Sequence, residues 1–323
     1  MKTKFGYHAS HEQFSPRELL DLVQAAEAAG FDCAKCSDHF HPWGEAQGQS
    51  GAAWPWLGAV MQATRLPMGI VSAPGYRYHP AVLAQSIATV SQMFEGRLWV
   101  ALGSGEAINE AITGLHWPEK PERNARLLEC IDITRRLLAG ETVTHRGRVQ
   151  VIEAKLYSRP NGPVALFGAA VSPDTAALLA PEVDGLLTTG GEPEDTAKVI
   201  EAFRKAGGKD KPVVLQTAIS WAPTEDEAMA SAVDQWGHAA AAIGEVTWDL
   251  RRPKDFDTVK QAIRPDDITK AVFVSADLDT HIERLRALAE LGPAEIHLHQ
   301  VGRNQRAVID LFGKEVLPSL REH

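Results

Sequence analysis

The sequence feature that most constrains the fold is a regular alternation of short apolar runs with longer amphipathic segments. The apolar runs predict strands at residues 3–8, 32–37, 67–72, 97–102, 164–169, 184–188, 213–220 and 294–300. Helical patterns lie at about 15–29, 79–93, 120–139, 174–181, 193–207, 224–242, 279–290 and 303–320. Strands joined by helices run parallel, and eight such units can close on themselves. We therefore predict an α/β fold, a (β/α)8 TIM barrel.

The chain length fits one elaborated barrel domain over residues 1–323, because barrels of this kind commonly carry loop insertions. Two connections are longer than usual. The first, at about 141–163, contains His145-Arg-Gly-Arg148 between β-prone residues and suggests a hairpin. The second, at about 243–272, is rich in proline and charge. We expect these insertions to cap a site, as long loops in compact domains often do.

Charge and apolar content limit the partners that we expect. The 33 basic and 42 acidic residues give a net charge of −9, without a basic cluster for a phosphate backbone or an anionic membrane. No secretory leader or bilayer-spanning run is apparent, so we expect a cytoplasmic protein. Cys33 and Cys36 form a C-x-x-C with no second pair, and we expect inert thiols rather than a metal site.

Polar groups gather after the predicted strands, where barrel enzymes carry their active sites. Glu12 follows the first strand, Asp38, His39 and Trp43 follow the second, and Glu106 follows the fourth. Histidine titrates near neutral pH, so His39 can exchange a proton with a substrate hydroxyl, with Glu106 as a partnering acid. A buried, hydrogen-bonded His39 without a catalytic role is the open alternative.

Two turns suggest contacts with a flat, phosphate-bearing ligand. Gly103-Ser104-Gly105 would need its third glycine at Ile108 to resemble a dinucleotide fingerprint, so we interpret it as a loop whose backbone approaches a planar group. Ser172-Pro173-Asp174 reads as a helix start whose free amides can bind phosphate. A simple turn and a simple helix cap remain the alternatives.

Several motifs together resemble one known family. The chain is similar to the luciferase-like flavin- or deazaflavin-dependent oxidoreductases, and most closely to the coenzyme F420-dependent glucose-6-phosphate dehydrogenase group. The similarity covers nearly the whole chain. The matching segments are 8–14, 37–40, 42–43, 76–80, 103–110 and 304–306.

The resemblance implies roles for individual residues. His39 would take the substrate proton as hydride leaves for the cofactor, with Glu106 supporting it as an acid. Ile70-Val71 would form a non-proline cis peptide beneath the cofactor ring. The reacting face would be lined by His39, Glu106, Trp43 and Glu12, and the cofactor would be bound by Asp38, Ile70, Val71, Ser104, Gly105, Ala170, Val171 and Ser172.

Two departures from the deazaflavin pattern favour FMN and another substrate. Val171-Ser172 replaces a paired glycine, and the surrounding loop looks more like that of FMN-using relatives. A lysine expected to hold a sugar phosphate falls at Gly191, although Lys270 is a candidate for the second. We therefore predict FMN-dependent hydride transfer or oxygenation of a small organic substrate. The alternative is an F420-dependent dehydrogenase of a sugar phosphate or an alcohol.

Two other classes of function stay open. His39-x-His41 and His297-x-His299 resemble paired ligands of a metal-dependent barrel hydrolase. A carboxylate is usually added to such a shell, and Trp43 suits a stacking wall better, so we expect no catalytic metal. A protein that binds a flavin without turnover is the other class. Association as a homodimer is expected from the resemblance alone.

Overall fold

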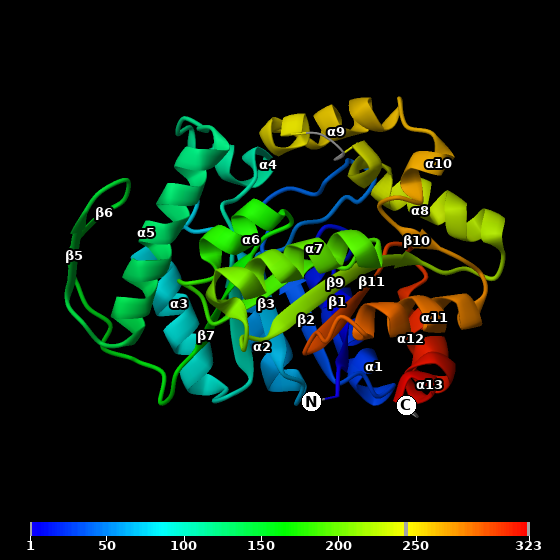
Figure 1. Cartoon of the computed structure of the whole chain (residues 1–323), viewed down its shortest axis with the longest axis horizontal. Helices are drawn as coiled ribbons and strands as arrows, with labels where there is room; N and C mark the ends of the chain where they lie inside the picture. The colour runs from blue at the N-terminus through cyan, green and yellow to red at the C-terminus, as the bar shows by residue number, and fades with distance from the viewer. Residues whose placement is uncertain (1, 242–244, 322–323) are drawn as a thin grey trace.

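Eight parallel strands close a barrel in the computed structural model, which describes residues 2–241 and 245–321 (Figure 1). Each strand pairs with the next, and the last pairs with the first. In order they are β1 (Lys4–Ala9), β2 (Cys33–Ser37), β3 (Met68–Ser72), β4 (Leu98–Leu102), β7 (Ala165–Ala169), β8 (Gly185–Thr189), β9 (Val213–Ser220) and β11 (Glu295–Gln300). All eight lie within one residue of the predicted ranges, and the TIM-barrel prediction is confirmed.

Helices cover the outside of the barrel, mostly where the sequence predicts them. They are α1 (Pro16–Ala28), α3 (Pro80–Met93), α5 (Lys120–Leu138), α6 (Pro173–Leu179), α7 (Pro193–Phe203), α8 (Glu225–Ala241), α11 (Leu278–Ala289), α12 (Gln305–Leu311) and α13 (Leu317–Arg321). The prediction missed α2 (Ala53–Ala63). This helix has no side-chain cap at Ala52, so the main signal of a helix start is absent.

The two insertions take different forms. The first contains the antiparallel strands β5 (Val143–Arg146) and β6 (Gln150–Ala154), which confirms the hairpin. The second is not a bare loop. It carries η3 (Glu245–Asp249), α9 (Pro253–Lys260) and α10 (Pro265–Ile268), followed by β10 (Phe273–Val274) beside β9. In Figure 1, α8, α9 and α10 lie over the end of the barrel opposite the chain termini.

The inside of the barrel is divided between a polar and an apolar wall. Alternation along β11 packs Ile296 and Leu298 into the outer core, whereas Glu295, His297 and His299 occupy the other face. His299 contacts His8 of β1, with ring centroids 4.3 Å apart, and Lys35 of β2 approaches His8 to 3.1 Å. The apolar wall contains Trp99, Ala101, Phe167, Leu187 and Val214. Among the described residues, no helix is both long and apolar enough to cross a bilayer.

Candidate active site

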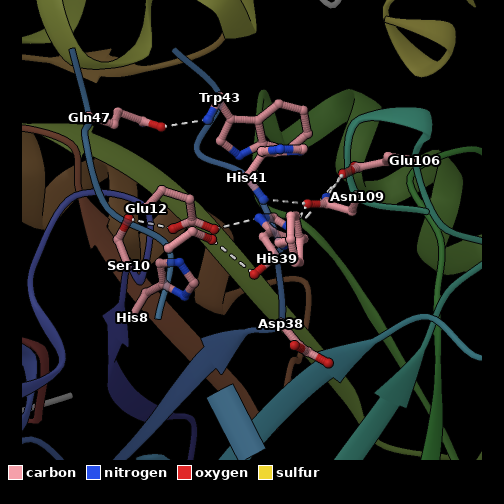
Figure 2. Close-up of polar contacts among 12 residues, drawn as sticks. His8, Ser10, Glu12, Asp38, His39, His41, Trp43, Gln47, Glu106 and Asn109 are labelled. Carbon is pink, nitrogen blue, oxygen red and sulfur yellow. Dashed lines mark hydrogen bonds and ion pairs between the residues drawn. The ribbon is translucent and has the colours of Figure 1, made fainter. Parts of the chain in front are cut away.

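The loops after β1 and β2 bring Glu12 and His39 together at the carboxyl ends of these neighbouring strands (Figure 2). His39 Nδ1 lies 2.5 Å from Glu12 Oε1. The hydroxyl of Ser10 donates to the other carboxylate oxygen, Oε2, at 2.7 Å. Both oxygens of Glu12 are therefore held, and the orientation of the His39 ring is set by a buried carboxylate.

A second carboxylate approaches the opposite nitrogen of His39. Glu106 lies in the loop between β4 and α4 (Ala107–Glu110), and its Oε2 is 3.9 Å from His39 Nε2. Asn109 donates to that oxygen at 3.3 Å, and its own carbonyl accepts the backbone N–H of Phe40 at 2.8 Å. Asn109 therefore ties the β2 loop to the β4 loop, and His39 lies between two carboxyl groups.

Burial and charge give the three groups different protonation states. Burial lowers the pKa of His39, but the charge of Glu12, its hydrogen bond and the charge of Glu106 together outweigh burial and raise the pKa above its usual 6.5. Burial opposes ionisation of Glu12, yet His39 and the hydrogen bond from Ser10 bring its pKa down to about 2. Burial raises the pKa of Glu106. Glu12 is thus a fixed anion, whereas Glu106 retains a proton more readily.

Aromatic rings form a wall beside His39. Trp43 meets His39 edge-on with centroids 5.4 Å apart, and it stacks on His238 of α8 at 5.4 Å with an interplanar angle of 10°. Phe256 of α9 contacts the same indole at 5.3 Å. The second insertion therefore covers part of the site, as expected. Neither His238 nor Phe256 was predicted at the site, because His238 lies near the end of α8 and Phe256 in the second insertion, both far along the chain from a strand end.

Asp38 is held by the protein rather than left free. Ser72 donates to its Oδ2 at 2.9 Å, and Arg77 Nη1 lies 3.1 Å from its Oδ1. Arg77 also pairs with the buried carboxylate of Glu110 at 3.6 Å. Arg77 and Glu110 belong to the two motifs 76–80 and 103–110, but nothing in the sequence marked them as supports. The expected contact of Asp38 with a cofactor ring stays a prediction.

The predicted cis peptide is wrong. No cis peptide bond occurs in the described parts of the chain, so Ile70 and Val71 are joined in trans. Both residues instead continue the regular parallel ladder of β3 with β2 and β4, which the trans form allows without its cost of about 3 kcal/mol. Val71 accepts the backbone N–H of Asp38 at 2.9 Å. Its side chain packs with the apolar wall of the barrel.

The loop Gly103-Ser104-Gly105 requires a glycine at position 105 for local structural reasons. Gly105 has φ +80°, and a Cβ there would lie 2.8 Å from Glu110 Cγ, so a side chain at this position would be strained and crowded. Ser104 is partly buried in the same loop. The proposed approach of a planar ligand to Ser104 and Gly105 stays a prediction.

The loop after β7 begins α6 as predicted. Ser172 is the N-cap and accepts the backbone N–H of Thr175 at 3.4 Å. Lys120 Nζ donates to the hydroxyl of Ser172 at 3.4 Å. Val171 is exposed and Ala170 is buried. A lysine that the sequence did not single out therefore stands beside the predicted phosphate loop.

The four histidines proposed as metal ligands do not gather. His41 Nδ1 lies 2.7 Å from the carbonyl of Ile108, and His299 contacts His8 and Trp236 instead of a carboxylate. Within the described ranges, one group of three metal-capable side chains converges, and His297 is its only member from the two predicted pairs. The geometry therefore gives no support to a hydrolytic metal at His39.

Comparisons with known proteins show the family of the chain. Residues 1–295 match the luciferase-like monooxygenase family. The chain is 36% identical over 330 residues to the F420-dependent glucose-6-phosphate dehydrogenase of Microbacterium testaceum, with 99% of this chain and 98% of the relative covered. The corresponding protein of Nakamurella multipartita is 35% identical over 329 residues, with coverage of 98% and 96%.

Solved structures of F420-dependent enzymes also superimpose on this chain. An F420-dependent secondary alcohol dehydrogenase in complex with an F420-acetone adduct superimposes with a TM-score of 0.91 at 31% identity, covering 99% of this chain and 100% of the other. The F420-dependent tetrahydromethanopterin reductase of Methanopyrus kandleri gives 0.79 at 20% identity, with coverage of 99% and 100%. This second likeness concerns the fold alone.

Proposed function

Because the chain belongs to the luciferase-like monooxygenase family and is a flavin- or F420-dependent oxidoreductase, we propose that it oxidises a small neutral alcohol with coenzyme F420. The observation that carries this proposal is His39 between two carboxyl groups, 2.5 Å from Glu12 and 3.9 Å from Glu106. An imidazole so placed can take the hydroxyl proton of an alcohol while hydride leaves the carbinol carbon.

The choice of F420 revises the preference for FMN. The relatives with 31–36% identity over nearly the full length carry F420 in their names. The matching structures that contain FMN, a riboflavin lyase and a Baeyer-Villiger monooxygenase, are 14% and 17% identical. The preference for FMN came mainly from the pair Val171-Ser172. Two residues are weaker evidence for a cofactor than similarity to F420-dependent proteins along the whole chain. We therefore favour an F420-dependent dehydrogenase over an FMN enzyme.

The predicted phosphate loop suits a phosphate-bearing cofactor. The hydroxyl of Ser172 and the ammonium of Lys120, 3.4 Å apart, provide a neutral and a cationic donor at one loop. Val171 offers an exposed apolar side chain beside them. We assign the cofactor phosphate to Ser172 and Lys120, and the ring to Asp38, Ser104 and Val71. Coenzyme F420, when bound, supplies a deazaflavin ring that accepts hydride.

A neutral alcohol fits this chain better than a sugar phosphate. Gly191 stands where a phosphate-binding lysine is expected, and Arg284 donates to its carbonyl at 2.7 Å. Both oxygens of Glu192 also accept from Arg284, at 3.0 and 3.1 Å, so this guanidinium is already paired. Lys270 pairs with Asp267 at 3.1 Å. A phosphate dianion needs uncommitted cations to replace its water, which these pairs do not offer.

The protein's part in the reaction is proton transfer and orientation. Glu12 holds His39 Nδ1, which leaves Nε2 to accept the hydroxyl proton of the substrate. The buried anion of Glu12 then stabilises the imidazolium that forms. Glu106, whose pKa is raised by burial, lies beside Nε2 and can exchange the proton with it. Trp43 covers one side of His39 and limits the access of water.

The proposal is tested by mixing the purified protein with oxidised coenzyme F420 and a series of small secondary alcohols, then following the loss of the deazaflavin absorption band. We expect reduction with at least one alcohol and none with glucose 6-phosphate. Reduction by glucose 6-phosphate alone would refute the substrate class. Tight binding of FMN without binding of F420 would refute the cofactor.

A further inference from the structure

We propose that Cys33, Glu295 and His297 form a buried binding site for a divalent transition-metal ion of the zinc class, inside the barrel and separate from the His39 site. One ligand atom from each side chain lies within 4.8 Å of the others. His297 Nε2 is 2.8 Å from Glu295 Oε2 and 3.9 Å from Cys33 Sγ. The three residues belong to β2 and β11, the two strands that flank β1.

A glycine on β1 provides the space in which these side chains meet. Gly6 is in register with Cys33 on one side and with His297 on the other. A Cβ at Gly6 would lie 2.4 Å from His297 Nδ1 and 2.8 Å from Cys33 Sγ. Real Cβ atoms do not come that close, so the convergence of thiol and imidazole depends on this glycine.

The distances suit a tetrahedral ion after small movements. Zinc binds thiolate at about 2.3 Å and imidazole nitrogen or carboxylate oxygen at about 2.0–2.2 Å, so neighbouring ligand atoms in a tetrahedron are roughly 3.3–3.6 Å apart. The observed separations of 2.8 and 3.9 Å lie on either side of that range. Three protein ligands leave one position for water.

The chemistry of the ligand set favours a zinc-class ion over calcium or magnesium. A thiolate and an imidazole prefer softer transition ions, whereas calcium and magnesium prefer oxygen ligands only. One thiolate, one carboxylate and a neutral imidazole balance the charge of a divalent ion. Cys33 and His297 are fully buried, so such neutrality matters. Trp99 donates to the Glu295 carboxylate at 3.2 Å and fixes its position from outside the ligand set.

Without an ion, the imidazole nitrogen that faces the cluster cannot bond both of its neighbours. His297 Nε2 faces the carboxylate of Glu295 at 2.8 Å and the thiol of Cys33 at 3.9 Å, and a single ring nitrogen makes one good hydrogen bond at a time. Breaking a buried polar cluster is costly, but filling it with one ion that binds all three groups is favourable. Because the cluster links β2 and β11 across β1, the ion would hold together strands that lead to Glu12 and His39. We assign it a structural role.

Cobalt(II) tests this site, because a thiolate bound to cobalt gives a charge-transfer band in the near ultraviolet. The full-length protein is treated with a chelator, dialysed, and titrated with cobalt chloride. We expect one equivalent to bind and the band to appear. Cys33→Ser should abolish the band, whereas the matched controls Cys36→Ser and Cys130→Ser should keep it, because these buried thiols belong to no convergent ligand group among the described residues.

A second variant keeps the test decisive if Cys33→Ser does not fold. Glu295→Gln preserves the thiol and the side-chain volume, so it should keep the band while weakening cobalt binding by about tenfold or more. Failure of the wild type to bind cobalt would overturn the proposal. It would also be overturned by a band that persists in Cys33→Ser, or by unchanged affinity in Glu295→Gln.

Discussion

The barrel contains two Glu–His pairs in contrasting surroundings: an upper pair, Glu12 and His39, and a lower pair, Glu295 and His297. In the upper pair the two groups are 2.5 Å apart, and the His39 side chain is 19% exposed. In the lower pair they are 2.8 Å apart, and the His297 side chain is fully buried. The same two side chains can therefore transfer a proton to a substrate only where the second imidazole nitrogen remains accessible.

The position of each pair relative to the barrel strands explains why their exposure differs. The upper pair lies in loops beyond the carboxyl ends of β1 and β2, where helices and aromatic rings form only a partial cover. The lower pair lies within β11 and packs against Gly6 of β1. A side chain in a loop beyond a strand end can meet a ligand, whereas one inside the barrel meets its neighbours. Predictions that treat the pairs separately test this difference.

The largest expected effect is on turnover. His39→Ala removes the proposed general base and should lower kcat by about 10²–10⁴-fold, because proton transfer by a positioned side chain contributes that much. His297→Gln, a change in the lower pair, should leave kcat within a few-fold while it lowers stability. Steady-state kinetics with F420 and the best alcohol measure both. An equal loss in the two variants would break the comparison.

A smaller effect is expected on stability. Gly6→Ala would place a Cβ 2.4 Å from His297 Nδ1 and should lower the free energy of unfolding by about 1–3 kcal/mol through overpacking. The control is Gly58→Ala in α2, where nothing lies within 4 Å of the added atom. Its higher helix propensity should leave stability unchanged or raise it by up to about 1 kcal/mol. Denaturant unfolding measures both, and equal effects would contradict the crowding at Gly6.

The upper pair also predicts a pH dependence. The pKa of His39 is raised by Glu12, and the base must be neutral, so kcat/KM should fall as pH decreases through a value above 6.5. Glu12→Gln removes the anion and should move this limb to lower pH. The pH profiles of wild type and variant decide the point. A limb that does not move would show that Glu12 does not control the protonation of His39.

The same ion pair should stabilise the fold over a limited pH range. Glu12 has a lowered pKa, so its contribution is present above the unfolded carboxyl value and is lost as pH falls towards about 2. His39 has a raised pKa, so its contribution is present below 6.5 and is lost as pH rises through the folded value. The difference in unfolding free energy between wild type and Glu12→Gln should peak between about pH 4.5 and 6.5. A difference that is constant with pH would contradict this pairing.

The smallest effect is expected at Lys270. Its ammonium is exposed and pairs with Asp267, so Lys270→Ala should change stability by less than about 1 kcal/mol and kcat/KM on an alcohol by less than about twofold. Kinetics on the alcohol and on glucose 6-phosphate provide the check. A large loss would indicate that Lys270 contacts substrate and would restore the sugar-phosphate interpretation.

The sequence predicted the barrel well because β-branched runs and helix caps are local signals. It missed α2, whose start has no side-chain cap. His39, Glu12 and Glu106 were identified because residues after barrel strands meet at one end. Arg77 and Asn109 were not, since a supporting role depends on loop geometry. Cys33 and Glu295 are far apart in the chain, and closure of the barrel around β1 brings them together. The cis peptide expected at Ile70 came from the resemblance and is absent.

The most direct test of the central claim follows the hydrogen itself. The protein is mixed with oxidised coenzyme F420 and a small secondary alcohol deuterated at the carbinol carbon. The molecular mass of the reduced cofactor is then measured by mass spectrometry. We predict that reduced F420 carries one deuterium from the substrate and that His39→Ala binds F420 but forms almost none of this product. A wild-type protein that leaves F420 oxidised with every alcohol, or returns it without deuterium, would contradict the assignment.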